Sequence, residues 1–190
     1  MAFSCATRNL FSILPLLVVL SITFTPLAKS FAPSDKVTKQ LVDQICSDSA
    51  VYHKNFCVDW LTFDPETFKT DLSGLVELVI VRTHLFAYKN LGMMKDLART
   101  TADPTLKAPY GNCVTGYETA IQAIVEAEGF ATSKSYLLAS YRALKAVFSI
   151  STCAGQLDGR TNVPAYVPQR NLLFVRMCTV ANVFSSALAN

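Results

Sequence analysis

Side chains that could do acid, base or metal chemistry are few in this sequence, and none stands in a pattern typical of a catalytic site. His53 and His84 have no second histidine, cysteine or carboxylate at the spacing of a metal site. His84 lies one residue from an apolar helical face, which favours a half-buried structural histidine over a ligand or general base. Glu118, Glu126 and Glu128 share one predicted helix, where a solvated surface accounts for them without acid–base catalysis. With no phosphate loop and no Gly-x-Ser-x-Gly turn, we predict no enzyme activity, no metal and no cofactor.

Cysteine chemistry gives a stronger signal. Cys46 and Cys57 can close a short loop, whereas Cys113 and Cys153 each lie in the middle of a helix-like stretch, so that a bridge would join two antiparallel helices. Cys178 lies in the last apolar helix, where a buried, inert thiol is favoured over a nucleophile. Spacing alone does not choose among the possible pairings.

The N-terminal segment predicts export from the cell. It has a short start with one basic residue and an apolar middle, and it ends with small residues at Ala28 and Ser30. This order is typical of a secretory signal peptide over residues 1–30, with a cut after Ser30 or, alternatively, after Ala32. We therefore expect a secreted protein in an oxidising compartment, and Cys5 leaves with the leader.

A membrane anchor over residues 10–28 is the alternative interpretation of the same segment, because its length comes near that of a bilayer span. Pro15 and Pro26 interrupt it, and no basic cluster follows that could stop transfer. These features favour the cleaved signal peptide, after which we expect no membrane association.

The charges of the mature chain almost balance. The whole chain carries 17 Lys and Arg against 14 Asp and Glu, and Arg8 and Lys29 belong to the leader, which leaves 15 basic against 14 acidic residues. Without a run of basic residues, nucleic acid is not expected as a partner. An apolar content of 51% with 16% charged residues predicts a packed core and excludes wholesale disorder.

Helical periodicity dominates the mature chain. Asp64-Pro65 and Asp103-Pro104 each place an N-cap candidate before a proline at the first helical position. Gly129 is the predicted end of the second long helix, Thr132 or Ser133 the cap of the third, and Ala154 to Pro168 a loop. The predicted buried faces are Leu72, Leu75, Val76, Val79, Thr83, Phe86, Asn90, Met93 and Leu97; Cys113, Tyr117, Ala120, Ile121, Ile124 and Ala127; Leu137, Ser140, Tyr141, Leu144, Val147, Phe148 and Ser151; and Leu173, Met177, Val180, Ala181, Phe184 and Leu188.

Four amphipathic helices with short connections predict an all-α fold, an antiparallel up-down-up-down four-helix bundle. Shorter helical pieces over residues 37–61 precede it. We predict a helical hairpin over residues 31–62 and the bundle over residues 63–190, with a single domain over residues 37–190. The aromatic side chains on the predicted faces, Tyr141 and Phe148 included, are expected in the core.

The order of several short motifs resembles the plant pectin methylesterase inhibitor and invertase inhibitor family. The opening resembles it in Ile45-Cys46, Phe56-Cys57, Asp64-Pro65 and residues 71–75. The second bundle helix resembles the family in Asp103-Pro104, Asn112-Cys113 and Tyr117. Residues 140–146, Ser151-Thr152-Cys153 and Asn162-Val163-Pro164 complete the order.

This resemblance implies a four-helix bundle headed by a helical hairpin and stapled by two disulfides, Cys46–Cys57 and Cys113–Cys153. Cys178 matches a further cysteine that is unpaired in some members. Members of the family are secreted to the cell wall, or apoplast, do no chemistry themselves and cover the substrate cleft of one enzyme in a one-to-one complex. The resemblance thus implies a monomeric, extracellular enzyme inhibitor.

The resemblance also implies contact positions. In pectin methylesterase inhibitors, polar and acidic residues after the second-helix cysteine and around the third-helix Thr-Cys face the enzyme. The matching positions are Thr115, Thr119, Gln122, Thr152 and Gly155, of which only Thr152 keeps the family type. Neutral residues replace the usual acids, which is expected to weaken electrostatic complementarity more than the fold.

Three functions stay open from the sequence. Cys178 and Asn162-Val163-Pro164 favour a pectin methylesterase as the target. An acid invertase is the alternative, because the loop before the last helix keeps a proline and an aromatic, Pro164 and Tyr166, although it lacks the lysine of invertase inhibitors. A third hypothesis is a bundle that has kept the scaffold and lost the enzyme target.

Overall fold

The computed structural model describes residues 30–48 and 53–189. The chain divides between Ser30 and Phe31, and the unit that begins at Phe31 is described below. Its elements are α2 (Lys39–Cys46), α3 (Lys54–Phe63), the 3₁₀ turn η1 (Thr67–Lys69), α4 (Leu72–Thr100), α5 (Pro104–Thr132), α6 (Tyr136–Leu157) and α7 (Tyr166–Ala187). No strand forms in these ranges, so the predicted all-α class is confirmed. The predicted leader, over residues 1–29, and the choice between signal and anchor lie outside the described residues.

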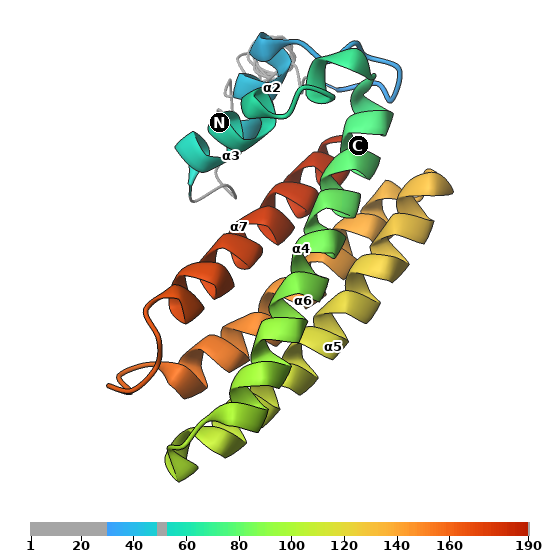
Figure 1. Cartoon of the computed structure of the whole chain (residues 1–190). Coiled ribbons are helices and arrows are strands. Elements are labelled where there is room, and N and C mark those ends of the chain that lie inside the picture. Colours follow the sequence, from blue (N-terminus) through green and yellow to red (C-terminus); the bar gives the residue numbers. More distant parts are fainter. Residues whose placement is uncertain (1–29, 49–52, 190) are drawn as a thin grey trace, which may run out of the picture. The chain divides into compact units, whose positions relative to one another are not determined.

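The four long helices form the predicted bundle (Figure 1). Helix α5 packs against α4 and α6, and α7 packs against α6 and α4, so the four helices close around one core. Short connections separate them, at residues 101–103, 133–135 and 158–165. Such connections force consecutive helices to run antiparallel.

The hairpin that precedes the bundle is joined by the disulfide Cys46–Cys57. Val42 and Ile45 from α2 and Leu61 from α3 are buried in the same core as the long helices. Both short helices contact α7, where the Arg176 guanidinium lies 5.8 Å from the centre of the Phe56 ring. The hairpin therefore covers α7, which accounts for the buried residues on several sides of that helix.

The two predicted Asp-Pro helix starts have different outcomes. The prediction at Asp103 is confirmed, because its carboxylate caps α5 by accepting the Thr105 N–H at 2.9 Å. The prediction at Asp64 is wrong: α3 ends there, and the Asp64 carboxylate accepts the Glu66 N–H and pairs with Arg82 at 3.0 Å. Helix α4 begins only at Leu72, where Asp71 accepts the Gly74 N–H at 2.8 Å.

The turn between α5 and α6 corrects two further predictions. Gly129 does not end α5, which continues to Thr132. The turn is closed by backbone bonds from Lys134 N–H to Ala131 O and from Ser135 N–H to Phe130 O, the two bonds of a Schellman motif. Lys134 takes the left-handed position with φ of 60°. The residue before α6 is Ser135, not Thr132 or Ser133 as predicted.

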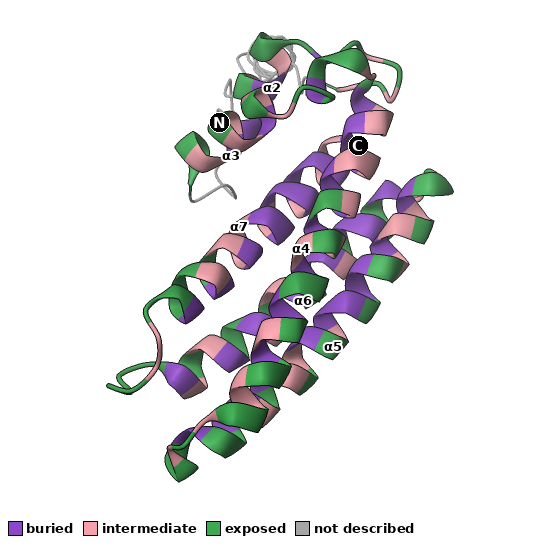
Figure 2. Ribbon diagram, in the orientation of Figure 1, coloured by how far each residue is buried: buried purple, intermediate pink, exposed green. Residues whose placement is uncertain are grey.

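Three of the four predicted core faces agree with the observed burial, and that of α6 does not (Figure 2). Most residues predicted to be buried on α4, α5 and α7 are buried. On α6 the core contains a different row, Ala139, Ala143, Ala146, Ile150, Cys153 and Leu157. Leu137, Tyr141, Leu144 and Phe148, predicted in the core, are exposed. Helix α6 has two apolar rows, and periodicity alone does not tell which one is buried.

The predicted loop from Ala154 to Pro168 is shorter than expected. Helix α6 continues to Leu157 and α7 begins at Tyr166, so only residues 158–165 connect them. Pro168 lies in the first turn of α7, where its missing N–H removes no helical bond. Tyr166, the aromatic of interest in this segment, is the first residue of a helix rather than part of a free loop.

Candidate interaction surface

The five predicted contact residues lie on the outer sides of two neighbouring helices. Thr115, Thr119 and Gln122 belong to α5, and Thr152 and Gly155 belong to α6; all are exposed except Thr119, which is half-buried. Each threonine hydroxyl donates to the backbone carbonyl four residues earlier in its own helix, at 3.0 to 3.4 Å. The hydroxyl oxygens remain able to accept a hydrogen bond from a partner.

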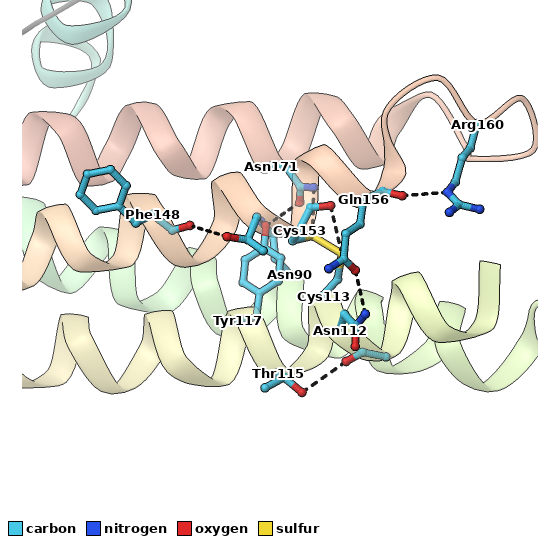
Figure 3. The surroundings of a disulfide bond; sticks show 12 residues. Asn90, Asn112, Cys113, Thr115, Tyr117, Phe148, Cys153, Gln156, Arg160 and Asn171 are labelled. Atoms are coloured by element: carbon cyan, nitrogen blue, oxygen red, sulfur yellow. Dashed lines mark hydrogen bonds between the residues drawn. A yellow bond between two sulfur atoms is a disulfide. The ribbon is translucent and has the colours of Figure 1, made fainter. Parts of the chain in front are cut away.

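The disulfide Cys113–Cys153 joins α5 and α6 and is a reference point for the positions on this surface (Figure 3). Thr115, Thr152 and Gly155 lie within one helical turn of it along their helices. Gln122 lies nine residues from Cys113, or roughly 14 Å along α5 at 1.5 Å per residue. Three of the five positions therefore lie at the level of the disulfide, whereas Gln122 lies further along α5.

The two helices are held close at the disulfide end. The Asn112 side chain donates to the Gln156 side chain at 2.8 Å across the outer seam. Gly116 allows a close approach of the two helices, because a Cβ there would lie 3.0 Å from the Ser149 carbonyl oxygen. A disulfide, a side-chain hydrogen bond and a glycine contact together make this end of the surface rigid.

A buried polar network supports the disulfide from inside (Figure 3). The Tyr117 hydroxyl accepts from the Asn90 side chain at 3.0 Å and donates to Asn171 Oδ1 at 2.8 Å. Asn171 in turn donates to Cys153 Sγ at 3.5 Å, and Arg170 Nε donates to Asn90 Oδ1 at 2.8 Å. Burial raises the pKa of the Tyr117 hydroxyl well above its usual range, so it stays protonated and donates throughout the accessible pH range.

The acids of α5 do not form an acidic surface. Glu118 pairs with Lys95 on α4 at 2.9 Å, and Glu126 pairs with Arg142 on α6 at 3.0 Å. Glu128 Oε2 lies 3.3 Å from His84 Nδ1. Each of these three glutamates is paired with a residue of a neighbouring helix. The predicted contact positions are neutral, and the paired glutamates do not add an acidic patch to them. His84 itself is half-buried, as the sequence predicted.

The loop over residues 158–165 is fixed to the start of α5. Asn162 Nδ2 donates to Asp103 Oδ2 at 2.8 Å, and the Arg160 guanidinium donates to the carbonyls of Gln156 and Thr105. The hydrogen bond from Asn162, with those from Thr105, holds the pKa of the Asp103 carboxyl below its usual value of 3.8. The N-cap of α5 thereby also anchors the connection to α7.

A groove of about 420 Å³ lies where this loop meets α6 and α7. Ser151, Gly155, Leu172 and Val175 contribute to its walls, with Arg160 at the loop side. Gly155 has open space where a Cβ would be. The groove is therefore next to the predicted contact position on α6.

Other kinds of site find little support in the described ranges. Across residues 30–48 and 53–189, no three His, Cys, Asp or Glu side chains gather as metal ligands would. No helix in the described part of the chain has both the length and the apolarity to cross a membrane. Cys178 is free and fully buried, and burial raises the pKa of its thiol well above the usual range, which makes it a poor nucleophile.

The structure shows one surface feature that the sequence interpretation missed, the exposed apolar row of α6. A signal for it was present. Cys113 lies on the buried face of α5, so a bridge from Cys113 to Cys153 requires the row that contains Cys153 to face the core. The second row, with Tyr141 and Phe148, must then face outward.

Comparisons with known proteins show which family this chain resembles. The sequence pattern of the plant invertase/pectin methylesterase inhibitor family matches residues 40–188. A pectinesterase inhibitor from Actinidia deliciosa is 31% identical over 188 residues, which cover 99% of this chain and 98% of that protein. Pectinesterase inhibitor 2 from Arabidopsis thaliana is 24% identical over 98 residues, which cover 52% of this chain and 57% of that protein.

Solved structures agree on the fold. A crystal structure of a pectin methylesterase inhibitor from Arabidopsis thaliana superimposes with a TM-score of 0.61 at 22% identity, over 81% of this chain and 99% of that one. A mutant form of a pectin methylesterase inhibitor from Arabidopsis gives 0.68 at 22% identity, over 76% and 95%. Both disulfides that the motifs implied are present in the structure. The chain therefore belongs to the plant invertase/pectin methylesterase inhibitor family.

Proposed function

We propose that the chain is a secreted inhibitor that blocks the active-site cleft of a cell-wall pectin methylesterase in a one-to-one complex. The observation that carries this proposal is the similarity, over almost the whole chain, to a protein named as a pectinesterase inhibitor. The family match over residues 40–188 supports it. The protein would act in the apoplast and would need no cofactor, because it occupies a cleft and transforms no substrate.

The physical basis is a rigid face that loses little conformational entropy when it docks. The disulfide Cys113–Cys153 and the Asn112–Gln156 hydrogen bond fix α5 and α6 next to each other. Preorganised surfaces bind with less ordering cost than flexible ones. We assign contact to Thr115, Thr119, Gln122, Thr152 and Gly155 on this face.

The decisive measurement is a titration of the purified protein against a pectin methylesterase and, in parallel, an acid invertase. We expect full inhibition of the pectin methylesterase at saturating inhibitor, with a dissociation constant of about 1 µM or below and a one-to-one end point when the enzyme is well above that constant. Inhibition of the invertase alone would assign the chain to the other branch. No inhibition of either enzyme by micromolar protein would contradict the proposal and favour a bundle with another binding partner.

A matched pair of glycine variants tests the contact face. Gly155 on α6 and Gly92 on α4 both lie on exposed helix surface with open space where a Cβ would be. Both Gly155→Arg and Gly92→Arg should therefore fold. Gly155→Arg should weaken inhibition about tenfold or more by a clash with the enzyme, whereas Gly92→Arg should inhibit like the wild type. Equal inhibition by both variants would exclude the α6 end of the face.

Acid invertase stays the second candidate because of the segment before α7. Pro164 and the half-exposed Tyr166 are retained from the pattern of invertase inhibitors. The structure places Tyr166 in the first turn of α7, beside a groove with Met93, Leu97 and Arg170. Tyr166→Ala should weaken inhibition only if the invertase is the target.

A further inference from the structure

The exposed apolar row of α6 is the least expected feature of the surface. Leu137, Tyr141, Leu144 and Phe148 expose 52%, 60%, 36% and 64% of their surfaces. They stand on the side of α6 opposite the buried row that contains Cys153. Contiguous apolar surface of this kind marks a binding site more often than chance.

The spacing of this row is that of a helix-pairing seam. Continued through Ser151 and Gly155, its intervals read 4, 3, 4, 3 and 4 residues, the alternation that places side chains at the a and d positions of a coiled coil. The series reads the same in both directions. It is therefore complementary to itself in an antiparallel pair related by a two-fold axis, as an isologous interface requires.

The side-chain sizes fit this antiparallel register. We place the two-fold axis at the level of Ala146. Leu137 of one copy then faces Gly155 of the other. In the same way Tyr141 faces Ser151, and Leu144 faces Phe148. Large residues thus meet small ones at both ends. Ser151 and Gly155, where the register places Tyr141 and Leu137 of the second copy, form part of the wall of the groove of about 420 Å³ between α6, α7 and their connecting loop.

The charges at the ends of α6 agree with the same register. Lys134 precedes the helix and Asp158 follows it; both are exposed, and neither forms an ion pair with another residue of the ranges 30–48 and 53–189. In an antiparallel pair, Lys134 of each copy lies beside Asp158 of the other. The dipoles of the two helices then run in opposite directions, which is the favourable arrangement. The like-charge approach of the two Lys145 side chains near the axis is at the exposed edge, where salt screens it.

We propose that the chain forms a two-fold dimer by antiparallel packing of α6 on α6 of a second copy. The four large side chains and the residues beside them would bury on the order of 1,000 Å² in total, the lower limit for a specific interface. The dimer is therefore weak, with a dissociation constant in the micromolar range. The monomer expected from the sequence is then the dissociated form.

The proposed dimer has a consequence for inhibition, which rests on the proposed function. Thr152 and Gly155 lie on the face of α6 that the second copy covers. Dimer formation and enzyme binding then exclude each other, so the dimer is a reserve form that dissociates when the enzyme captures a single copy.

Sedimentation velocity without any enzyme tests the dimer itself, on protein made in an oxidising secretory host so that both disulfides form. Between about 1 and 300 µM we expect a shift from monomer to dimer, as mass action predicts for a micromolar dissociation constant. The Tyr141→Ser/Phe148→Ser double variant should weaken association about 30-fold or more, since each change occurs twice in the dimer. Leu85→Ser/Tyr88→Ser, at similarly exposed apolar positions on α4, should associate like the wild type. A monomer throughout this range overturns the proposal, and so does a dimer that the α6 variant leaves intact.

A charge exchange tests the antiparallel register. Lys134→Glu and Asp158→Lys should each weaken the dimer several-fold by placing like charges together, and the double variant should restore it. A parallel pair, or a contact elsewhere, gives no rescue and contradicts the register. Circular dichroism of each variant shows whether the fold is kept.

Addition of the enzyme separates the two proposals. If both hold, wild-type dimer and pectin methylesterase should give a complex with the mass of one inhibitor and one enzyme. A complex that contains two inhibitor copies would overturn the mutual exclusion. A dimer that inhibits neither enzyme would leave the α6 pairing in place and contradict the proposed function alone.

Discussion

At the scale of single residues, Asp103 joins the start of α5 to the loop before α7 through one carboxylate. It caps α5 at Thr105 and also accepts the Asn162 amide from the loop before α7. Both hydrogen bonds favour the ionised form and hold the pKa of this carboxyl below 3.8. A group with a lowered folded pKa stabilises the fold above its unfolded pKa and loses this contribution as the pH falls through the folded value.

The Asn162→Ala substitution tests this carboxylate. We expect the pKa of Asp103, followed by NMR, to rise toward 3.8, and the protein to be less stable than the wild type at pH 6. The stability difference should shrink below about pH 3.8, because protonation removes the charge that Asn162 stabilises. Asn182→Ala, which removes a bond to the neutral Ser140 carbonyl, is the control, with a difference that does not change with pH. Equal pH dependence of both variants would contradict the assignment.

At the scale of the element, α6 shows how packing chooses between two equivalent helix faces. Three alanines are among its buried residues, beside Tyr136, Ile150 and Leu157, whereas the exposed row carries Tyr141 and Phe148. Small residues let α6 approach α5 and α7 closely, and the disulfide to Cys113 fixes that orientation. Tyr141 and Phe148 are then left on the outside.

Glycines in neighbouring helices give a measurable test of this close packing. Gly92→Ala on the exposed face of α4 should raise the free energy of unfolding by about 0.5–1 kcal/mol, the usual gain of alanine in a helix. Gly116→Ala on α5 should lack that gain and fall about 1 kcal/mol below Gly92→Ala, because its Cβ would lie 3.0 Å from the Ser149 carbonyl oxygen. Denaturant unfolding measures both. Equal stabilisation by the two substitutions would show that α5 and α6 are not packed this closely.

At the scale of the whole molecule, one disulfide joins the two helices of the hairpin and the other joins two helices of the bundle. Cys46–Cys57 closes the hairpin that covers α7, with a sequence separation of 11. Cys113–Cys153 joins two bundle helices across a separation of 40. The loop-entropy account of disulfides assigns about 3 kcal/mol to the first and about 4 kcal/mol to the second.

Double cysteine variants test which of the two disulfides stabilises the fold more. Cys113→Ala/Cys153→Ala should lower the free energy of unfolding by about 4 kcal/mol and Cys46→Ala/Cys57→Ala by about 3 kcal/mol, measured in guanidinium chloride. In the first variant Asn171 also loses its contact with Cys153 Sγ, which increases the loss. Cys178 reports unfolding, because its buried thiol should react with a thiol reagent only in the unfolded chain. A larger loss from the hairpin bridge than from the bundle bridge would contradict this account.

Most of the fold could be predicted from the sequence, whereas the arrangement of side chains on the contact surface could not. Asp103-Pro104 and the faces of α4, α5 and α7 followed local rules of capping and periodicity. Asp64 satisfied the same capping rule, and its carboxylate accepts the N–H two residues on as that of Asp103 does, but only the short turn η1 follows and α4 begins at Leu72. Gly129 failed as a helix stop because Lys134 takes the left-handed turn position a few residues later.

The sequence by itself determined the helical class, the number and order of the bundle helices, and, through its ordered motifs, the family and the disulfide pairing. These follow from interactions within a few residues and from spacings that the chain displays directly. Periodicity within α6 left open whether the row with Tyr141 and Phe148 faces outward, and the bridge to Cys113 decides it. Only the tertiary structure decided that Asn162 is bound to Asp103, and that Asn90, Tyr117 and Asn171 form one buried network. The reason is that burial and polar pairing are properties of helices packed together, and a single helix with two apolar rows contains no preference between them.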